Sequence, residues 1–281
     1  MPIAFLTCNT DTMPADESLA GILAMAAGLI AIGVAALRFA WHFIRPWFPP
    51  RPVPGARLEI TLAFEVALVF VVASSLAFLS FGPKPEQQSI ARALLVMLTA
   101  NTFTIIYIGL VLRARGGRLA DLGIAPANFK RGLGYAAILY LAFLPIVGGT
   151  QVALEALSQA IFGHTLAQQR VVVELGANAG LRHNIPLLLA IALIVPFCEE
   201  FLFRGFLYTV LRRHLSATLA IAIDAVIFGL VHDAGISAVI LLGGLLAFLF
   251  ERTGSLWACT LAHSLHNTST VLLILFQGGS A

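Results

Sequence analysis

The chain has 281 residues, of which 59% are hydrophobic and 11% are charged, and its mean hydropathy is +0.92. A soluble domain has about 25% charged residues, so the composition excludes a soluble protein and predicts a polytopic membrane protein. The net charge of +3 does not indicate a nucleic-acid partner, because the basic residues lie mostly in loops between apolar segments. The three cysteines fit neither a disulfide framework nor a zinc-ribbon spacing.

Eight apolar segments are candidates for transmembrane helices, which need about 20 residues each. We therefore predict an all-α, polytopic membrane fold with about eight spans. In chain order the predicted spans are residues 19–44, 60–81, 93–112, 132–149, 185–211, 216–232, 236–250 and 256–276.

The segments between the spans complete the predicted organisation. A polar tail occupies 1–18, and the N-terminal helices with their basic connector occupy 19–131. The fourth span and an interfacial loop follow at 132–184, with a short amphipathic helix expected at 152–162. The last four spans form a C-terminal core at 185–276, and a short tail ends the chain at 277–281.

The loops between eight spans must alternate between the two sides of the bilayer. The odd-numbered loops carry eleven basic residues, Arg45, Arg51, Arg57, Arg113, Arg115, Arg118, Lys130, Arg131, Arg212, Arg213 and Arg252. The even-numbered loops carry four, Lys84, Arg92, Arg170 and Arg182. By the positive-inside rule the odd loops are cytoplasmic, and we expect both termini outside. The expected location is a bacterial inner or plasma membrane.

Two adjacent carboxylates and a guanidinium interrupt the fifth predicted span. A charge at the centre of a spanning helix costs about 2.5–3.5 kcal/mol on insertion scales, so such residues usually mark a functional site. Glu200 and Arg204 are four residues apart on one helix face, which predicts an ion pair with a supporting role. Glu199 is rotated by about 100° from Glu200 and has no built-in partner, so we expect it to carry the chemistry.

Two further polar groups lie in the last spans. His232 ends the motif Phe228-Gly-Leu-Val-His232, and His263 lies four residues before Asn267 on one helix face. His232 falls near the outer end of its predicted span, whereas Glu199 and His263 fall nearer the middle of theirs. A tilted or longer helix would bring them to one depth. We predict a polar active-site cavity formed by the C-terminal four helices.

These residues suit peptide hydrolysis in two ways. In the first, Glu199 is a general base that deprotonates water, and His232 helps to hold that water. His263 and Asn267 then donate hydrogen bonds to the oxyanion, each worth about 2.7–4 kcal/mol. In the second, Glu199, His232 and His263 bind Zn²⁺ and leave an open position for water. The chain has no HExxH motif, and the residues alone leave both alternatives open.

The order of the three motifs resembles the CPBP family of intramembrane proteases. These motifs are Glu199-Glu200-Phe-Leu-Phe-Arg204, Phe228-Gly-Leu-Val-His232 and His263-Ser-Leu-His-Asn267, each on its own apolar helix. The family includes CAAX prenyl endopeptidases of the Ras-converting-enzyme type and bacteriocin-processing enzymes. The resemblance is firm over about residues 185–275, weaker over 113–135 and absent before that.

The resemblance implies a role for each matching residue. Glu199 would activate water with His232 as its partner, His263 and Asn267 would stabilise the oxyanion, and Glu200 and Arg204 would be supporting residues. The family has been described both as metalloproteases and as metal-independent glutamate proteases, and we favour the metal-independent mechanism over Zn²⁺. The expected partners are the lipid bilayer and a membrane-embedded or membrane-proximal peptide substrate.

Two other functions remain open at this stage. One is a non-catalytic membrane protein, such as an immunity protein, that binds a peptide in the same cavity. The other is a proton-coupled transporter that uses Glu65, Asp224 and Glu199. Asp224 lies two turns before His232, and it is a candidate partner for Arg204 or His266. The sequence does not specify the substrate or the oligomeric state.

Overall fold

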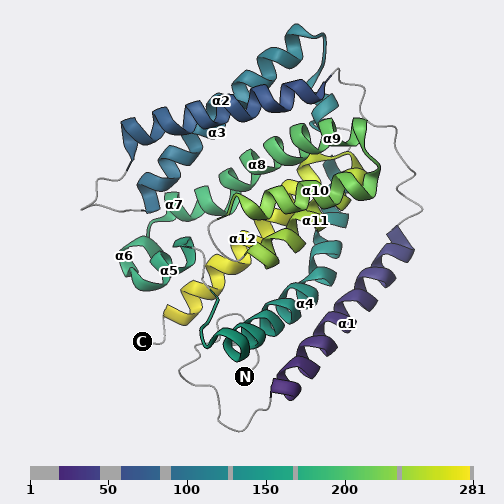
Figure 1. Ribbon diagram of the computed structural model, residues 1–281, viewed down its shortest axis with the longest axis vertical. Helices are drawn as coiled ribbons and strands as arrows, with labels where there is room; N and C mark the ends of the chain where they lie inside the picture. The colour runs from purple at the N-terminus through teal and green to yellow at the C-terminus, as the bar shows by residue number, and fades with distance from the viewer. Residues whose placement is uncertain are drawn as a thin grey trace.

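The computed structural model describes residues 19–44, 58–82, 90–125, 129–166, 170–232 and 236–278. The described residues form helices with no strand among them, so the predicted all-α class is confirmed. The predicted N-terminal tail and the last three residues lie outside the described residues. The long helices pack side by side and run between the two ends of the molecule (Figure 1).

The first half of the chain consists of four long helices. In order they are α1 (Leu19–Ile44), α2 (Ile60–Phe81), α3 (Ile90–Ala114) and α4 (Phe129–Phe162). α1 packs along α4, and α2 and α3 form a hairpin on the opposite side of the molecule (Figure 1). The basic connector between α3 and α4 contains a short 3-10 helix, η4 (Leu119–Leu122).

The second half of the chain forms the central part of the molecule. It begins with two short helices in the predicted interfacial loop, α5 (Arg170–Ala177) and α6 (Ala179–Arg182). The fifth span is one continuous rod composed of α7 (Ile185–Leu189), the π-helical η6 (Ala190–Ile194), α8 (Val195–Glu200), the π-helical η7 (Phe201–Tyr208) and α9 (Thr209–His214). Three helices complete the chain, α10 (Ala217–Leu230), α11 (Ile236–Thr253) and α12 (Leu256–Gly278).

The lengths of these helices confirm a polytopic membrane fold. Among the described residues five stretches are long and apolar enough to cross a bilayer, Leu19–Phe43, Ile60–Phe81, Ile90–Ala114, Gly132–Phe162 and Ile185–His214. α10 is a shorter apolar helix of 14 residues, about 21 Å long. α11 and α12 have 18 and 23 residues. Each of the eight predicted spans therefore corresponds to a helix or a continuous helical rod.

The fourth span differs from its prediction. We expected it to end at Gly149 and a separate helix to begin at residue 152, but α4 continues without a break to Phe162. A Cβ atom on Gly149 would lie 2.7 Å from the carbonyl oxygen of Ala26 in α1. The glycine therefore allows close approach of two helices, which is its common use in membrane proteins, and does not end the helix.

Odd-numbered loops contact one another at one end of the molecule. Arg213, at the end of α9, donates from Nη1 to the carbonyl oxygen of Leu58 at 3.3 Å, just before α2. The N–H of Leu256 donates to the carbonyl oxygen of Gly123 at 3.0 Å, which joins the loops before α12 and α4. Gly123 has a φ of +84°, a conformation that favours glycine, and it lies against the ring of Phe250. Both contacts join odd-numbered loops, as the alternation of eight spans requires.

Candidate active site

The helical rod of the fifth span changes its hydrogen-bond register on both sides of the two carboxylates. η6 precedes α8, which ends in Glu199 and Glu200, and η7 follows it. Pro196 lies in the first turn of α8 and has no N–H to donate to the preceding turn. Short π-helical segments of this kind are frequent at functional sites.

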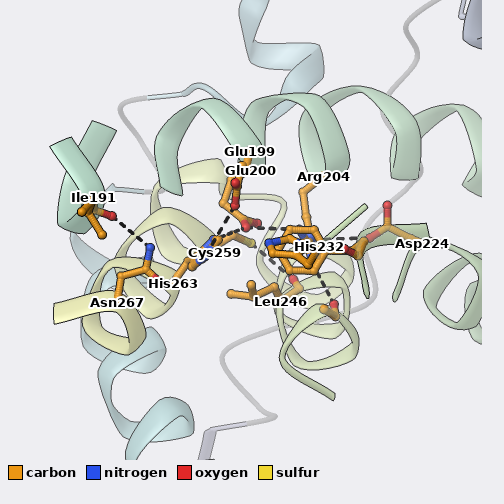
Figure 2. Close-up of polar contacts among 12 residues, drawn as sticks. Ile191, Glu199, Glu200, Arg204, Asp224, His232, Leu246, Cys259, His263 and Asn267 are labelled. Atoms are coloured by element: carbon orange, nitrogen blue, oxygen red, sulfur yellow. Dashed lines mark hydrogen bonds and ion pairs between the residues drawn. The ribbon is translucent and has the colours of Figure 1, made fainter. Parts of the chain in front are cut away.

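Asn267 supplies a hydrogen bond that this local register leaves unmade. The N–H of Val195 donates to the carbonyl oxygen of Ala190, five residues back, so the next donor in the π-helical pattern would be Pro196 to Ile191. Proline cannot make that bond, and Nδ2 of Asn267 in α12 donates to the Ile191 oxygen instead, at 2.9 Å (Figure 2). This contact was not predicted from the sequence, although a proline just before the two carboxylates was a signal that the backbone there needs an outside donor.

Arg204 lies at the centre of a buried charged cluster (Figure 2). Its Nη1 donates to Oε1 of Glu200 at 3.1 Å, and its Nη2 donates to the carbonyl oxygen of Gly243 at 3.0 Å. Its Nε lies 3.5 Å from Oδ2 of Asp224. The guanidinium also lies 4.3 Å from the ring centroid of Phe228, within reach of a cation–π interaction. One side chain therefore joins the fifth span to α10 and α11.

The cluster explains why three charged side chains tolerate full burial. Glu200, Arg204 and Asp224 are all 0% exposed. A buried charge without a partner is strongly destabilising, so the two carboxylates depend on the one guanidinium they share. The predicted contact between Glu200 and Arg204 is present, and of the two candidate partners for Asp224 the structure has Arg204.

His263 lies between the two adjacent carboxylates. Its Nδ1 is 2.8 Å from Oε1 of Glu200, and its Nε2 is 3.7 Å from Oε2 of Glu199. The first contact is a hydrogen bond, whereas the second is longer than the usual 2.7–3.2 Å for a direct N–H···O bond. Polar groups at this separation are commonly bridged by a water molecule. The arrangement therefore allows one water molecule to contact both Oε2 of Glu199 and Nε2 of His263.

A cavity of about 300 Å³ lies beside this pair. Glu199, His232, His263 and Asn267 all line it, so the structure brings together the four predicted catalytic residues. The side chain of Glu199 is 15% exposed and that of Glu200 is 0% exposed, which separates the carboxylate facing the cavity from the one behind it.

His232 reaches the cavity from the end of a short helix. α10 ends at Leu230, and Nδ1 of His232 is 2.6 Å from the carbonyl oxygen of Phe228. The Phe228 ring lies 4.8 Å from the ring of His232 and 5.7 Å from that of His263, centroid to centroid. The expected difference in depth between His232 and Glu199 therefore does not keep them apart, because α10 stops where its end meets the same cavity.

Two other candidates have distinct surroundings. His266 lines the cavity, and its ring lies edge-on to that of Tyr140 at 6.1 Å. Glu65 lies outside the cavity, on α2, where its carboxylate accepts a hydrogen bond from Tyr107 at 3.2 Å. Two of the three residues named for a transporter, Glu65 and Glu199, therefore do not share a cavity.

The zinc alternative requires three ligands that meet at one point. Within the described part of the chain, no group of three His, Cys, Asp or Glu side chains is arranged to hold a metal ion. Glu199, His232 and His263 line one cavity, and the contact of Nδ1 of His263 with Glu200 leaves Nε2 of that ring toward Glu199. A histidine that binds a metal commonly donates its other ring nitrogen to a carboxylate, so the zinc alternative stays a prediction.

Comparisons with known proteins assign the region that contains these residues. The family model described as "Type II CAAX prenyl endopeptidase Rce1-like" matches residues 181–269. A protein of Bacillus subtilis (strain 168), named "Putative membrane peptidase YdiL", is 35% identical over 95 residues. Residues 181–269 are thus similar to membrane proteases of the CAAX type, in agreement with the CPBP resemblance. The resemblance based on the three motifs is thus confirmed.

The matched region accounts for only part of the chain. The alignment with the Bacillus subtilis protein covers 32% of this chain and 38% of that relative, so the chain spans well under half of the relative's length. No solved structure gives a significant match. The matched residues run from α6 into α12 and include every candidate site residue from Glu199 to Asn267.

Proposed function

We propose that the protein is an intramembrane endopeptidase that hydrolyses a membrane-proximal peptide bond. The observation that carries this proposal is the 3.7 Å separation between Glu199 and His263 at the wall of a cavity that His232 and Asn267 also line. Its support from relatives is the CPBP family match and the name of the Bacillus subtilis protein. The proposed location is a bacterial inner or plasma membrane.

The proposed reaction needs only water and the side chains of the cavity. Glu199 takes a proton from a water molecule held with His232, and the water oxygen attacks the carbonyl carbon of the peptide. His263 and Asn267 donate hydrogen bonds to the resulting oxyanion, which preorganised donors stabilise effectively in a dry site. Collapse of the tetrahedral intermediate breaks the C–N bond, and the proton on Glu199 passes to the leaving amine.

The surrounding contacts support these assignments. The hydrogen bond from Nδ1–H of His263 to Glu200 holds the ring with Nε2 toward Glu199, and Nε2 donates to the oxyanion when the ring carries a second proton there. Asn267 uses one amide hydrogen on Ile191, and its amide group has a second that is free to donate to an oxyanion. Glu200 and Arg204 lie behind the reacting groups and support them.

The test is cleavage of membrane-proximal fluorogenic peptides by the purified protein in detergent. General-base catalysis contributes about 10²–10⁴-fold, so Glu199→Gln should reduce kcat at least about 100-fold. Glu65→Gln is the matched control, since it changes the same side chain outside the cavity, and it should keep wild-type activity. Equal activity in the two variants would overturn the assignment of Glu199.

The same assay separates the zinc and binding alternatives. Activity that survives a chelator, with no zinc found by elemental analysis, supports direct activation of water. Activity that is lost with the chelator and restored by zinc would make Glu199, His232 and His263 metal ligands. If no peptide is cut but the library binds equally to wild type and Glu199→Gln, the protein is a peptide binder.

A further inference from the structure

The cavity has a polar end and an apolar end. Glu199 and His263 lie at the polar end. Ile274 is eleven residues beyond His263 on α12, about 16 Å along the helix, and it also lines the cavity. There it belongs to a cluster of buried side chains from different helices, Ile90, Leu175, Leu187, Ile191, Val271 and Ile274. We call this cluster, with the partly buried Leu94 and Val172 packed against it, the apolar end.

The lining of the cavity indicates the chemistry of its occupant. Apart from Glu199 and three histidines, the described residues that line it carry no ionisable group. A charged substrate side chain packed among these apolar residues would lose its hydration, which is strongly unfavourable for an unpaired charge. The cavity has a volume of about 300 Å³. That space suits a short extended segment of peptide.

We propose that the apolar end binds one bulky, uncharged side chain of the substrate a few residues away from the bond that is cut. This inference rests on the proposed function, since it places the reacting bond at Glu199. Continuity of the cavity carries it: residues of both ends line one cavity, so an extended peptide whose carbonyl lies beside Glu199 reaches the apolar end about five residues further on, at about 3.4 Å per residue. Met97 and Val172 set the size that is accepted, because both line the cavity without being fully buried in the wall.

The helix that carries Val172 is held in place at the end of the cavity. Oε2 of Glu174 accepts a hydrogen bond from the N–H of Ile90, the first residue of α3, at 2.9 Å. Successive residues of α5 face different ways: Val172 lines the cavity, and Val173 is 52% exposed on the outer side. The chain therefore offers a matched pair of valines for a test, one inside the cavity and one outside it.

The test measures side-chain preference with the full-length protein in detergent. Peptides that the wild type cleaves are varied to Ala, Leu, Phe or Trp at each of about six positions on either side of the cut bond. Val172→Ala and Met97→Ala should raise the ratio of kcat/KM for Trp over Leu by roughly tenfold, since even one methylene in an apolar pocket changes specificity about 10-fold or more. Val172→Phe and Met97→Phe should lower that ratio, and Val173→Ala and Val173→Phe should leave it unchanged.

A second measurement separates this inference from the proposed function. A membrane-proximal peptide library with the same side-chain changes is titrated against the Glu199→Gln protein, with and without the Val172 substitutions, by fluorescence anisotropy. If the wild type cuts no peptide but Val172→Ala shifts binding toward larger side chains, side-chain binding at the apolar end stands and the proposed function fails. If peptides are cut and the Val172 and Val173 variants show the same preference, the inference fails and the proposed function stands. If the wild type cuts no peptide and binding does not depend on side-chain size, both the inference and the proposed function are overturned.

Discussion

Nδ1 of His263 lies 2.8 Å from Oε1 of Glu200, although the two residues are 63 apart in sequence and on different helices. The same oxygen accepts a hydrogen bond from Arg204. A carboxylate that binds one nitrogen of a histidine determines which nitrogen faces the reacting groups. Here the orientation of His263 toward Glu199 depends on a residue that the cavity does not contact.

Glu200→Ala should therefore lower kcat without a matching rise in KM. A displacement of about 1 Å in a catalytic group can cost about 100-fold in rate, so we expect a loss of about 10- to 100-fold. Glu200→Gln retains an oxygen that accepts a hydrogen bond from the ring, and it should recover part of the activity. Steady-state kinetics on one cleaved peptide measure both effects. Equal losses in the two variants, or a change confined to KM, would contradict the positioning role.

Arg204→Met should destabilise the protein more than any substitution in the cavity lining. It leaves the buried carboxylates of Glu200 and Asp224 without their cation, and breaking a buried pair in this way costs about 3–5 kcal/mol. Unfolding in detergent, followed by heat or denaturant, measures the change. A triple variant that adds Glu200→Gln and Asp224→Asn should be more stable than Arg204→Met alone, because it removes the unpaired charges. A triple variant no more stable than the single one would argue against an electrostatic origin.

Two adjacent glycines of α4 should respond in opposite ways to alanine. A Cβ on Gly149 would meet the backbone of α1, so Gly149→Ala should destabilise the protein by about 1–3 kcal/mol. A Cβ on Gly148 meets no atom within 4 Å, and Gly148→Ala should leave stability unchanged or raise it by up to about 1 kcal/mol. Melting temperatures in detergent give the comparison. Similar melting temperatures for the two variants would mean that α1 does not pack closely on this face.

The predicted orientation can be checked with single cysteines in a Cys8→Ser background, since Cys198 and Cys259 are buried. Thr165→Cys lies in the loop after α4, and Ser216→Cys lies between α9 and α10. By the distribution of basic residues, a membrane-impermeant maleimide should label Thr165→Cys in intact cells and Ser216→Cys only after permeabilisation. The reverse pattern would invert the proposed topology.

The sequence predicted the helices better than their internal geometry. Each predicted span corresponds to a helix or a helical rod, and α1 and α2 have the predicted bounds. The π-helical register of η6 and η7 was not predicted, because it changes backbone hydrogen bonds without changing the apolar pattern from which the span was recognised. The continuation of α4 past Gly149 was missed for a related reason: a glycine that ends a helix and one that lets a neighbour approach look alike in a single sequence.

The residues of the candidate site were predictable because polar groups are costly in apolar helices. On this ground we predicted Glu199, His232, His263 and Asn267 as site residues. The structure brings all four to one cavity. The sequence did not predict the partners, since hydrogen bonds between helices depend on their rotation and tilt. The contact of Glu200 with His263 is an example: the sequence paired Glu200 only with Arg204, four residues away on the same helix.

The length of α4 has a consequence for the lipid around the protein. Its 34 residues span about 51 Å, whereas the hydrocarbon core of a bilayer is about 30 Å thick. Near its end, Ser158 donates to the carbonyl oxygen of His164, and Glu155 accepts from the N–H of Leu166. Residues 164–166 are thus attached to a part of α4 that extends beyond the hydrocarbon core, so a change in bilayer thickness changes how much of this extension is immersed. Cleavage rates in vesicles should accordingly vary with acyl-chain length, and a Glu155→Ala variant should show a weaker dependence.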